Sequence, residues 1–338
     1  MIHSRLRQPR PSRRGFLVLC ILWFLLQATA VFSEEMKKAT FIPQWVPQSQ
    51  FAGYFVAHEK GIYRQNGIDL TILRGGPEQP PSELLEKGVV DFGTLFLSTG
   101  IQKRAQGVRL INLAQIGQRS SLMLVAKKAG GIHLPQDMNG KKVGLWGPEF
   151  QVQPRAFFRK YNLAVIVVPQ STTLNLFLRG GVDVCSAMWY NEYHLILNSG
   201  FDADALTTFL MSDHGFNFPE DGIYCLEKTF RRDPQLCHRF VKASIEGWQY
   251  AFRHPEEALS IVMKWAQEGN AGTNRVHQKW MLDRMKDIIL YPNEKDSLGV
   301  LSGEDYKRVT REYARNGLIQ RVPSFSEFFA GTNLRLTP

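Results

Sequence analysis

The sequence has few cysteines and none of the common catalytic signatures. Its four cysteines are Cys20, Cys185, Cys225 and Cys237, and no two of them have the C-x-x-C spacing typical of metal ligands. The eight histidines are scattered without an H-E-x-x-H pair, and neither a G-x-S-x-G elbow nor a G-x-x-x-x-G-K-[ST] phosphate loop occurs. We therefore predict no catalytic residue, no metal site and no cofactor. Buried free thiols are the expected state of the cysteines, although an oxidising compartment would permit a Cys225–Cys237 disulfide.

Long apolar runs are also lacking, apart from one near the amino terminus. Gly15 to Leu26 is nearly all apolar, which is shorter than the roughly 20 residues that cross a bilayer comfortably. Five arginines precede this run and Ala28-Thr29-Ala30 follows it with small-x-small spacing. This pattern predicts that residues 1–33 are a secretory signal peptide, and Ser12–Leu17 resembles a twin-arginine export motif. An uncleaved anchor helix is the alternative. We expect a periplasmic protein that is soluble after signal cleavage.

A dense basic surface is a third absence. The formal charge is +10, but five of the 41 basic residues precede residue 15, which leaves 36 basic against 31 acidic residues. No Lys/Arg block with interleaved aromatics remains, so we expect no nucleic-acid partner. The length of 338 residues allows one large or two medium domains with a full core.

The most informative stretch runs from Gln44 to Leu73. A β-like segment, Ala39–Gln44, precedes a Trp-x-Pro loop, and apolar residues with helical spacing then predict a helix that Gly61 ends. The turn residues Asn66-Gly67 precede Ile68–Ile72, in which apolar and polar residues alternate as in a half-buried strand. Polar loop residues at the carboxyl end of a strand lie where α/β sheets bind small molecules.

Strands and helices alternate along most of the chain, which predicts an α/β fold with mixed sheets. The further expected strands are Val89–Gly93, Val108–Ile116, Leu122–Ala126, Val143–Trp146, Ala164–Val168, Val182–Met188 and Gly222–Leu226. The principal expected helices are Thr94–Gln106, Gln153–Tyr161, Thr172–Arg179, Pro234–Phe252, Pro255–Gln267, His277–Ile289 and Glu304–Asn316.

Two lobes of the same architecture are visible in this order. We expect lobe 1 to be discontinuous, with residues 34–123 and 224–338, and lobe 2 to be residues 124–223. Two strands would cross between the lobes near Leu122–Lys127 and Tyr224–Glu227. A cleft between such lobes is the default site for a small molecule.

Loops and helix starts facing this cleft would supply the ligand contacts. The candidate ligand-binding residues are Gln44, Trp45, Gln48, Phe51, Thr94, Phe96, Glu149, Trp189, Tyr190, Asn191 and Glu192. Aromatic faces, amides and two carboxylates suit a flat, nitrogen-rich heterocycle; we expect Trp45 and Tyr190 to stack and Glu149 and Glu192 to accept hydrogen bonds. Solvated surface or helix capping is the alternative role of these two carboxylates. Arg119 or Arg155 could instead serve an anionic ligand.

Several of these residues also fall in motifs of a known family. Gln44-Trp45-x-Pro47, Gly88-x-x-Asp91-x-Gly93 and Trp189–Tyr193 resemble the SsuA/ThiY-like proteins, the last motif resembling their pyrimidine-importer branch. The resemblance implies a type II periplasmic-binding fold of two lobes that closes over a small molecule. It further implies a monomeric solute-binding protein that delivers a thiamine pyrimidine precursor, or a similar heterocycle, to an ABC permease in the inner membrane.

The same superfamily includes thiamine-pyrimidine synthases, which this chain resembles less. These enzymes carry a cofactor-binding lysine and a consumed histidine where this sequence has about Leu95 and Thr99. Their cysteine-rich run corresponds to Phe216–Gly222 here, which has no cysteine. A synthase-like enzyme, a binding protein for a sulfonate- or nitrate-type anion, and the sensor half of a signalling system remain the alternatives.

Overall fold

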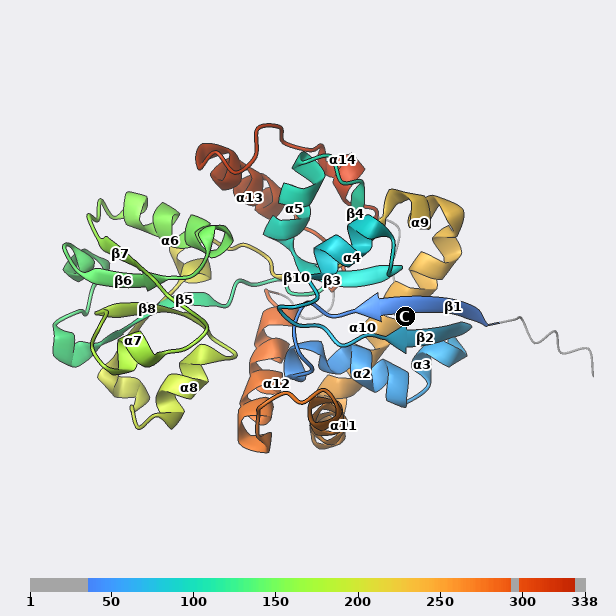
Figure 1. Cartoon of the computed structure of the whole chain (residues 1–338), viewed down its shortest axis with the longest axis horizontal. Helices are drawn as coiled ribbons and strands as arrows, with labels where there is room; N and C mark the ends of the chain where they lie inside the picture. Colours follow the sequence, from blue (N-terminus) through green and yellow to red (C-terminus); the bar gives the residue numbers. More distant parts are fainter. Residues whose placement is uncertain (1–35, 293–297, 332–338) are drawn as a thin grey trace, which may run out of the picture. The chain divides into compact units, whose positions relative to one another are not determined.

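The computed structural model describes residues 36–292 and 298–331, so the predicted signal peptide lies outside the described residues. The described residues from Lys37 onward belong to one compact unit, Lys37–Pro338. They form two five-stranded sheets flanked by helices (Figure 1). None of their helices is both long and apolar enough to cross a membrane.

The first sheet has the strand order β2-β1-β3-β10-β4. Its strands are β1 (Lys37–Ile42), β2 (Ile68–Ile72), β3 (Phe92–Phe96), β4 (Leu110–Gln115) and β10 (Asp221–Leu226). β1 is parallel to β2 and β3, whereas β10 is antiparallel to both β3 and β4. A strand from late in the chain is therefore inserted among strands from its beginning.

The second sheet repeats this plan with the order β7-β6-β8-β5-β9. Its strands are β5 (Leu122–Lys127), β6 (Lys142–Leu145), β7 (Ile166–Pro169), β8 (Val184–Met188) and β9 (Leu206–Leu210). β6 is parallel to β7 and β8, and β5 is antiparallel to β8 and β9. Here the inserted strand is the earliest one, so each sheet has one antiparallel strand in the same position.

The helices of the first half flank these strands. They are α2 (Ala52–Glu59), α3 (Ile62–Gln65), α4 (Pro81–Lys87), α5 (Leu97–Ala105), α6 (Pro148–Lys160), α7 (Asn175–Leu178) and α8 (Glu192–Asn198). Short 3-10 turns are η1 (Ser49–Phe51), η2 (Lys128–Gly130), η3 (Pro135–Met138), η4 (Ala203–Ala205) and η5 (Met211–His214). Gly61 takes φ 69° between α2 and α3, as expected for a residue that ends a helix.

Two expectations about elements are wrong in detail. The strand expected at Val89–Gly93 forms at Phe92–Phe96, and α5 begins only at Leu97. Gly88 ends α4 with φ 71°, so the apolar pair after it lies in a turn, and Val89 is 57% exposed. β9 is a strand that the sequence analysis does not anticipate.

The segments that pass between the sheets also differ from expectation. They are residues 116–121 and 215–220, because 122–127 and 224–226 belong to strands β5 and β10. The backbone N–H of Gly117 donates to Asp221 O at 2.8 Å, and that of Glu220 donates to Gly117 O at 3.1 Å. The two connecting segments therefore run side by side. The lobe boundaries stay a prediction.

A helical tail follows β10. Its helices are α9 (Glu227–Arg232), α10 (Pro234–Arg253), α11 (Pro255–Glu268), α12 (Arg275–Ile289), α13 (Gly303–Arg315) and α14 (Phe325–Phe328). Side-chain oxygens of Asp233, Asn274 and Ser302 accept from backbone N–H groups at the starts of α10, α12 and α13, which satisfies donors that a helix start leaves free.

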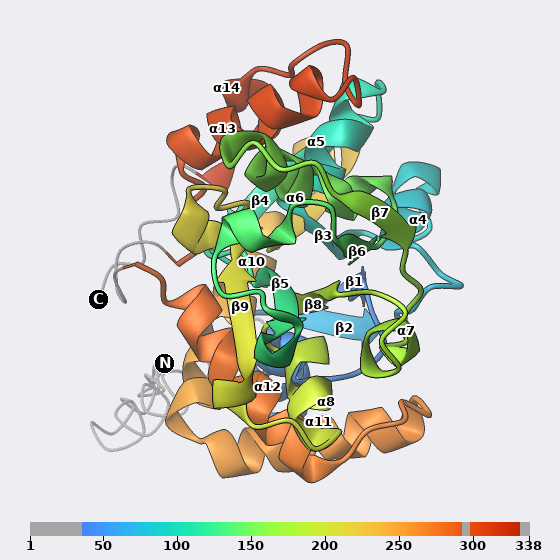
Figure 2. The same ribbon diagram turned by 90° about the vertical axis from the view of Figure 1, so that its left-hand side faces the viewer.

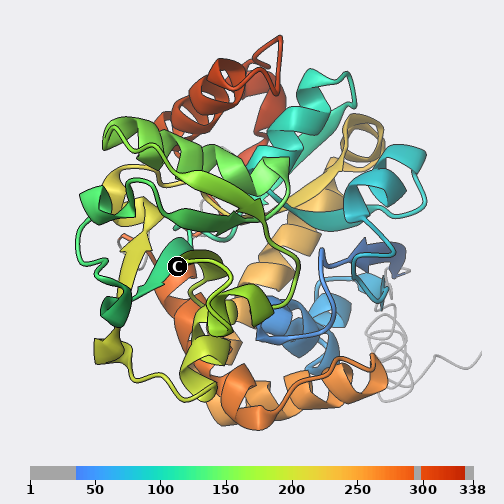
Figure 3. The same ribbon diagram turned by 60° about the vertical axis from the view of Figure 1, so that its left-hand side comes forward.

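The tail contacts both halves of the structure. On one side α13 lies against α6 (Figure 3). Arg159 pairs there with Glu312, and the Tyr313 hydroxyl donates to Glu149 O at 3.1 Å. On the other side α12 lies beside α8, with the Trp280 Nε1 donating to Trp189 O at 3.0 Å (Figure 2).

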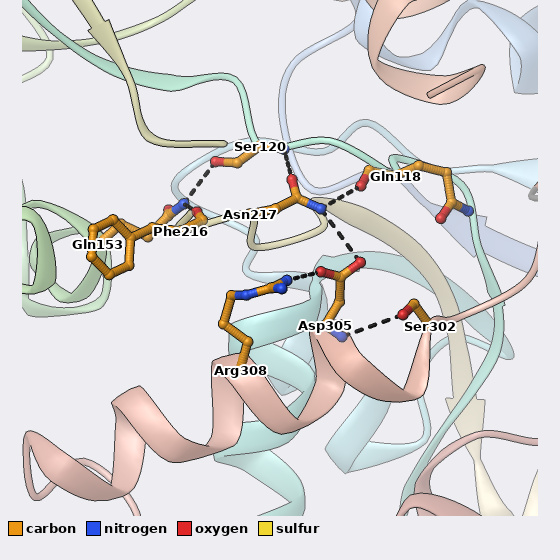
Figure 4. Close-up of polar contacts among 8 residues, drawn as sticks. All are labelled: Gln118, Ser120, Gln153, Phe216, Asn217, Ser302, Asp305 and Arg308. Atoms are coloured by element: carbon orange, nitrogen blue, oxygen red, sulfur yellow. Dashed lines mark hydrogen bonds and ion pairs between the residues drawn. The ribbon is translucent and has the colours of Figure 1, made fainter. Parts of the chain in front are cut away.

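The start of α13 also contacts the connecting segments. The side chain of Asn217 lies between Ser120, Gln118 and Asp305, and Asp305 forms an ion pair with Arg308 (Figure 4). From α6, the Gln153 Nε2 donates to Ser120 Oγ at 2.8 Å and to Phe216 O at 2.7 Å. The side chains of Asn217 and Gln153 thus each join the two segments.

The core is apolar and closely packed, and it includes Cys185, Cys225 and Cys237. All three are buried free thiols, so the disulfide considered for Cys225 and Cys237 is not formed. Burial raises the pKa of the Cys185 and Cys225 thiols, which keeps them protonated and unreactive.

Candidate functional site

A buried carboxyl group, Asp221, lies at the start of β10 and draws together polar residues from distant parts of the chain. The Gln44 amide donates to its Oδ1, and the Gln50 Nε2 donates to its Oδ2 at 2.7 Å. The Gln48 Nε2 in turn donates to Gln50 Oε1 at 2.6 Å, and the Gln44 backbone N–H donates to Thr94 Oγ1 at 2.9 Å. We call these five residues the Asp221 cluster.

Burial sets the protonation behaviour of this cluster. Asp221 is 4% exposed, and burial raises its pKa to about 7, against the opposing effect of the Gln50 and Gln44 hydrogen bonds. A carboxyl group with this pKa exists in both forms near neutrality, so it can accept from an N–H donor or donate to a ring nitrogen.

Glu220, the preceding residue, is a second buried carboxyl group with a different environment. Its Oε1 accepts from the Ser121 N–H at 2.6 Å and from the Ser121 hydroxyl at 2.8 Å. Its Oε2 is buried without a hydrogen-bond partner among the described residues. Burial raises its pKa to about 8 although the Ser121 bonds oppose this, and the charges of Asp221 and Glu192 add to the rise. Glu220 is therefore mainly protonated at pH 7.

The second half of the chain contributes Tyr190 and Glu192 at the end of β8. Tyr190 is 4% exposed; burial raises its pKa, and the negative charges of Glu220, Asp221 and Glu192 raise it further. The phenol of Tyr190 therefore lies in the field of all three carboxyl groups.

Glu192 is fixed by its own loop. Its Oε2 accepts from the Met188 N–H at 2.9 Å, and its Oε1 accepts from the Asn191 Nδ2 at 2.8 Å. Burial raises its pKa, and these hydrogen bonds oppose the rise. Each oxygen retains a lone pair, so these two hydrogen bonds are compatible with acceptance from a ligand.

The aromatic candidates have unequal surroundings. Phe51 is fully buried in the core, whereas Trp45 is half-buried. Phe96 meets the Phe150 ring edge-on at 5.7 Å. The guanidinium carbons of Arg119 and Arg284 lie 5.5 and 5.0 Å from the Trp189 ring, so protein cations already occupy this aromatic surface.

Glu149 directly precedes Phe150, whose ring contacts Phe96. It is exposed in the first turn of α6, and no described hydrogen bond joins its carboxylate to the Asp221 cluster. Its backbone oxygen accepts from Tyr313. Acidic side chains are common in a first helical turn because their negative charge interacts favourably with the positive end of the helix dipole.

The sequence analysis does not name Gln50, Asp221 or Glu220 as candidate residues. The sequence does contain a signal for two of them: the acidic pair Glu220-Asp221 lies directly before the expected strand Gly222–Leu226, within Phe216–Gly222. It predicts α12 but does not assign this helix to the site, although α12 contacts the loop beside Gln48: the Ser49 N–H donates to Gln278 Oε1 at 2.5 Å.

Two cavities lie away from the Asp221 cluster. One of about 680 Å³ is bordered by arginines of the α5 end, α9 and the carboxyl-terminal segment, and one of about 580 Å³ by α11 residues. Neither is lined by a residue of the Asp221 cluster. No group of three or more His, Cys, Asp or Glu side chains in the described residues is arranged to hold a metal ion. The ligand cleft expected from the sequence stays a prediction.

Comparison with known proteins places this fold and site in context. The family described as NMT1/THI5 like matches residues 48–258. The riboflavin-binding protein RibY of Chloroflexus aurantiacus is 23% identical over 305 residues, which cover 85% of this chain and 83% of RibY. A 4-amino-5-hydroxymethyl-2-methylpyrimidine phosphate synthase of Legionella pneumophila is 27% identical over 250 residues, 68% of this chain and 74% of the enzyme.

The fold is similar to that of the periplasmic aliphatic sulphonate binding protein SsuA from Escherichia coli. The TM-score is 0.65 at 13% identity, with 85% of this chain and 94% of SsuA covered. The two-lobe periplasmic-binding fold and the resemblance to SsuA/ThiY-like proteins are therefore confirmed. Because the family match spans more than half of its residues, the chain belongs to the NMT1/THI5-like family.

Proposed function

We propose that this protein is the extracytoplasmic solute-binding component of an ABC importer. It binds a small planar heterocycle, such as a thiamine pyrimidine precursor, as a monomer in the periplasm, and it passes the ligand unchanged to an inner-membrane permease. The amino-terminal signal pattern, the fold, and the binding functions that the names of RibY and SsuA state support this role.

The observation that carries the proposal is the buried Asp221 carboxyl group, which Gln44 and Gln50 hold and whose charge raises the pKa of Tyr190. Amino groups and ring nitrogens of a heterocycle can pair with such a carboxyl group, and the flat ring can stack on an aromatic face. Ligand contacts made from both halves of the chain would favour the closed arrangement of the lobes. The proposed ligand-binding residues are those expected from the sequence, together with Gln50 and Asp221.

A pyrimidine synthase is the second candidate, because the Legionella relative bears that name. Leu95 is buried in β3 at 2% exposure, and neither Leu95 nor Thr99 can form the expected bond to pyridoxal phosphate or be consumed as histidine is. Adding pyridoxal phosphate tests this directly, since a Schiff base at a lysine would give a new absorbance band. Its appearance, removed by borohydride, would favour the enzyme.

A sulfonate- or nitrate-type anion is the third candidate, on the grounds of the SsuA-like fold. The ionised form of Asp221, which is well populated near pH 7, disfavours an anion in the same place. Arg155 is exposed and donates to Gln151, and Arg119 pairs with Asp213. Both candidate arginines thus already have protein partners.

Calorimetry on the exported protein tests the proposal with a fixed panel: 4-amino-5-hydroxymethyl-2-methylpyrimidine, riboflavin and an alkanesulfonate. We expect a heterocycle to bind and Asp221→Asn to weaken it at least about tenfold, or ~1.4 kcal/mol. Asp204→Asn, an exposed change in η4, is the matched control and should have no effect. Binding of the alkanesulfonate alone, or equal affinity of Asp221→Asn, would contradict the proposal.

A further inference from the structure

A chain of side-chain hydrogen bonds runs from the tail helix α12 to the loop that carries Glu192. His194 Nδ1 lies 2.9 Å from His277 Nδ1, and His277 Nε2 lies 2.9 Å from Asn191 Oδ1. The Asn191 Nδ2 donates to Glu192 Oε1 at 2.8 Å. We propose that His277 is a positioning residue that orients Glu192 toward the ligand through Asn191. This inference rests on the proposed solute-binding function.

The direction of each hydrogen bond follows from the carboxylate end. Glu192 accepts, so Asn191 donates through its nitrogen and presents its oxygen to His277. His277 must therefore carry its proton on Nε2, and in the neutral ring its Nδ1 is then an acceptor. His194 completes the chain as an Nδ1–H donor, so the Asn198 Nδ2, which lies 3.3 Å from the same nitrogen, does not donate to it.

The two imidazoles are well placed to keep this order. His277 is 6% exposed and His194 is 7% exposed. The His194 ring stacks on Trp280 at 4.9 Å with an interplanar angle of 10°. The Asn274 side chain accepts from the His277 N–H at 2.9 Å, which fixes His277 in the first turn of α12.

The same helix also holds the other proposed ligand loop. Gln278, next to His277, accepts from the Ser49 N–H through its side chain and from the Ser49 hydroxyl, at 2.8 Å, through its backbone oxygen. α12 thus contacts the loop of Gln48 and the loop of Glu192 through adjacent residues. A helix in this position sets the spacing of the two loops.

The neutral state of His277 agrees with this geometry. Burial lowers its pKa to about 4, with the neighbouring His194 as the second cause. The nearby charged groups are Glu192 on the α8 side, Arg275 and Lys279 on α12, and Glu256 on α11, which pairs with both cations. Neutrality at pH 7 permits the single-tautomer chain described above.

The first experiment needs no ligand. Imidazole ¹⁵N spectra of the ligand-free protein at pH 7 should show His277 as the Nε2–H tautomer. Asn191→Ala should shift this tautomer equilibrium toward a mixture, because it removes the acceptor. An Nδ1–H tautomer, or a spectrum unchanged by Asn191→Ala, would overturn the inference whether or not the solute-binding proposal holds.

The second experiment measures affinity for whichever panel heterocycle binds. His277→Leu should weaken it about tenfold, whereas His277→Gln, which keeps an N–H near the Nε2 position, should recover most of that loss. His133→Leu, an exposed change, is the control, and each variant is checked for an unchanged melting temperature. Equal affinities of the Leu variant and the wild type would refute the positioning role. If the spectra are as expected but no panel compound binds, the hydrogen-bond chain stands. The role of His277 in ligand binding is then refuted together with the proposed function.

Discussion

Asn217 Oδ1 accepts a hydrogen bond from the backbone N–H of Ser120 at 2.8 Å. The bond joins the two segments that connect the sheets, which are 97 residues apart in sequence. The Nδ2 of the same side chain donates to Gln118 O at 3.0 Å. One amide therefore satisfies a donor and an acceptor of a backbone segment that has no strand partner at that point.

Replacement of Asn217 should loosen this junction. In Asn217→Ala the Ser120 N–H and the Gln118 carbonyl both lose a partner, so we expect the free energy of unfolding to fall by about 1–3 kcal/mol. Urea denaturation measures the change. Asn175→Ala, at an exposed position of α7, is the control and should stay within about 0.5 kcal/mol of the wild type. A change no larger than that of the control would show that the junction does not depend on Asn217.

Local sequence patterns predict most of the elements, because the spacing of apolar residues indicates a helix or strand and glycine indicates where it ends. α10, α11, α12 and α13 all lie within two residues of their expected limits. The shift of β3 has a local cause that apolar periodicity does not reveal. The chain turns after Gly88, so the apolar pair Val89-Val90 lies before the strand and not in it. β9 is not predicted because its sequence, Leu-Thr-Thr-Phe-Leu, does not alternate strictly between apolar and polar residues.

The candidate site was predictable only in its loops. Gln44 and Glu192 follow strands, so their position at a sheet edge could be read from the order of elements. The importance of Asp221 arises from burial by residues about 170 positions away, which no local pattern contains. Likewise, the arginine that lies over Trp189 from α12 is distant in sequence, so the engagement of that ring could not be foreseen.

The crossing of α2 and α10 depends on a close approach at Gly247. A Cβ there would lie 2.1 Å from the backbone oxygen of Gly53, and backbone cannot yield as a flexible side chain does. Gly247→Ala should lower the free energy of unfolding by at least about 3 kcal/mol, because relief requires the helices to separate. Gly303→Ala is the control, since nothing lies within 4 Å of its Cβ position. Thermal and urea unfolding of both variants provide the measurement; equal stability of the two would contradict this account.

Trp45 offers a test of ligand contact that is separate from folding. It is half-buried in the loop after β1, and the proposed role is to stack on the ligand. Trp45→Ala should weaken a bound heterocycle by about 1–3 kcal/mol, within the range of an aromatic stacking contact plus its buried area. Calorimetry gives the affinity and urea denaturation the stability, which should change much less. An unaltered affinity would remove Trp45 from the site.

Glu220 should make the stability of the protein depend on pH in a defined window. Its pKa is about 8 in the folded protein against the ordinary value of 4.5, so between these values the folded state binds more protons than the unfolded state. The stabilising contribution is therefore complete below pH 4.5 and is lost as pH rises through about 8. Asp221, with a pKa of about 7, acts in the same direction over a lower pH window.

Glu220→Gln keeps an oxygen that can accept from Ser121 and cannot ionise. The variant should therefore be more stable than the wild type at pH 9 and should lose less stability between pH 5 and 9. Urea titrations at a series of pH values measure this difference, with the exposed change Glu78→Gln as the control. Parallel pH profiles for Glu220→Gln and the wild type would mean that Glu220 is already ionised in the folded protein at neutral pH.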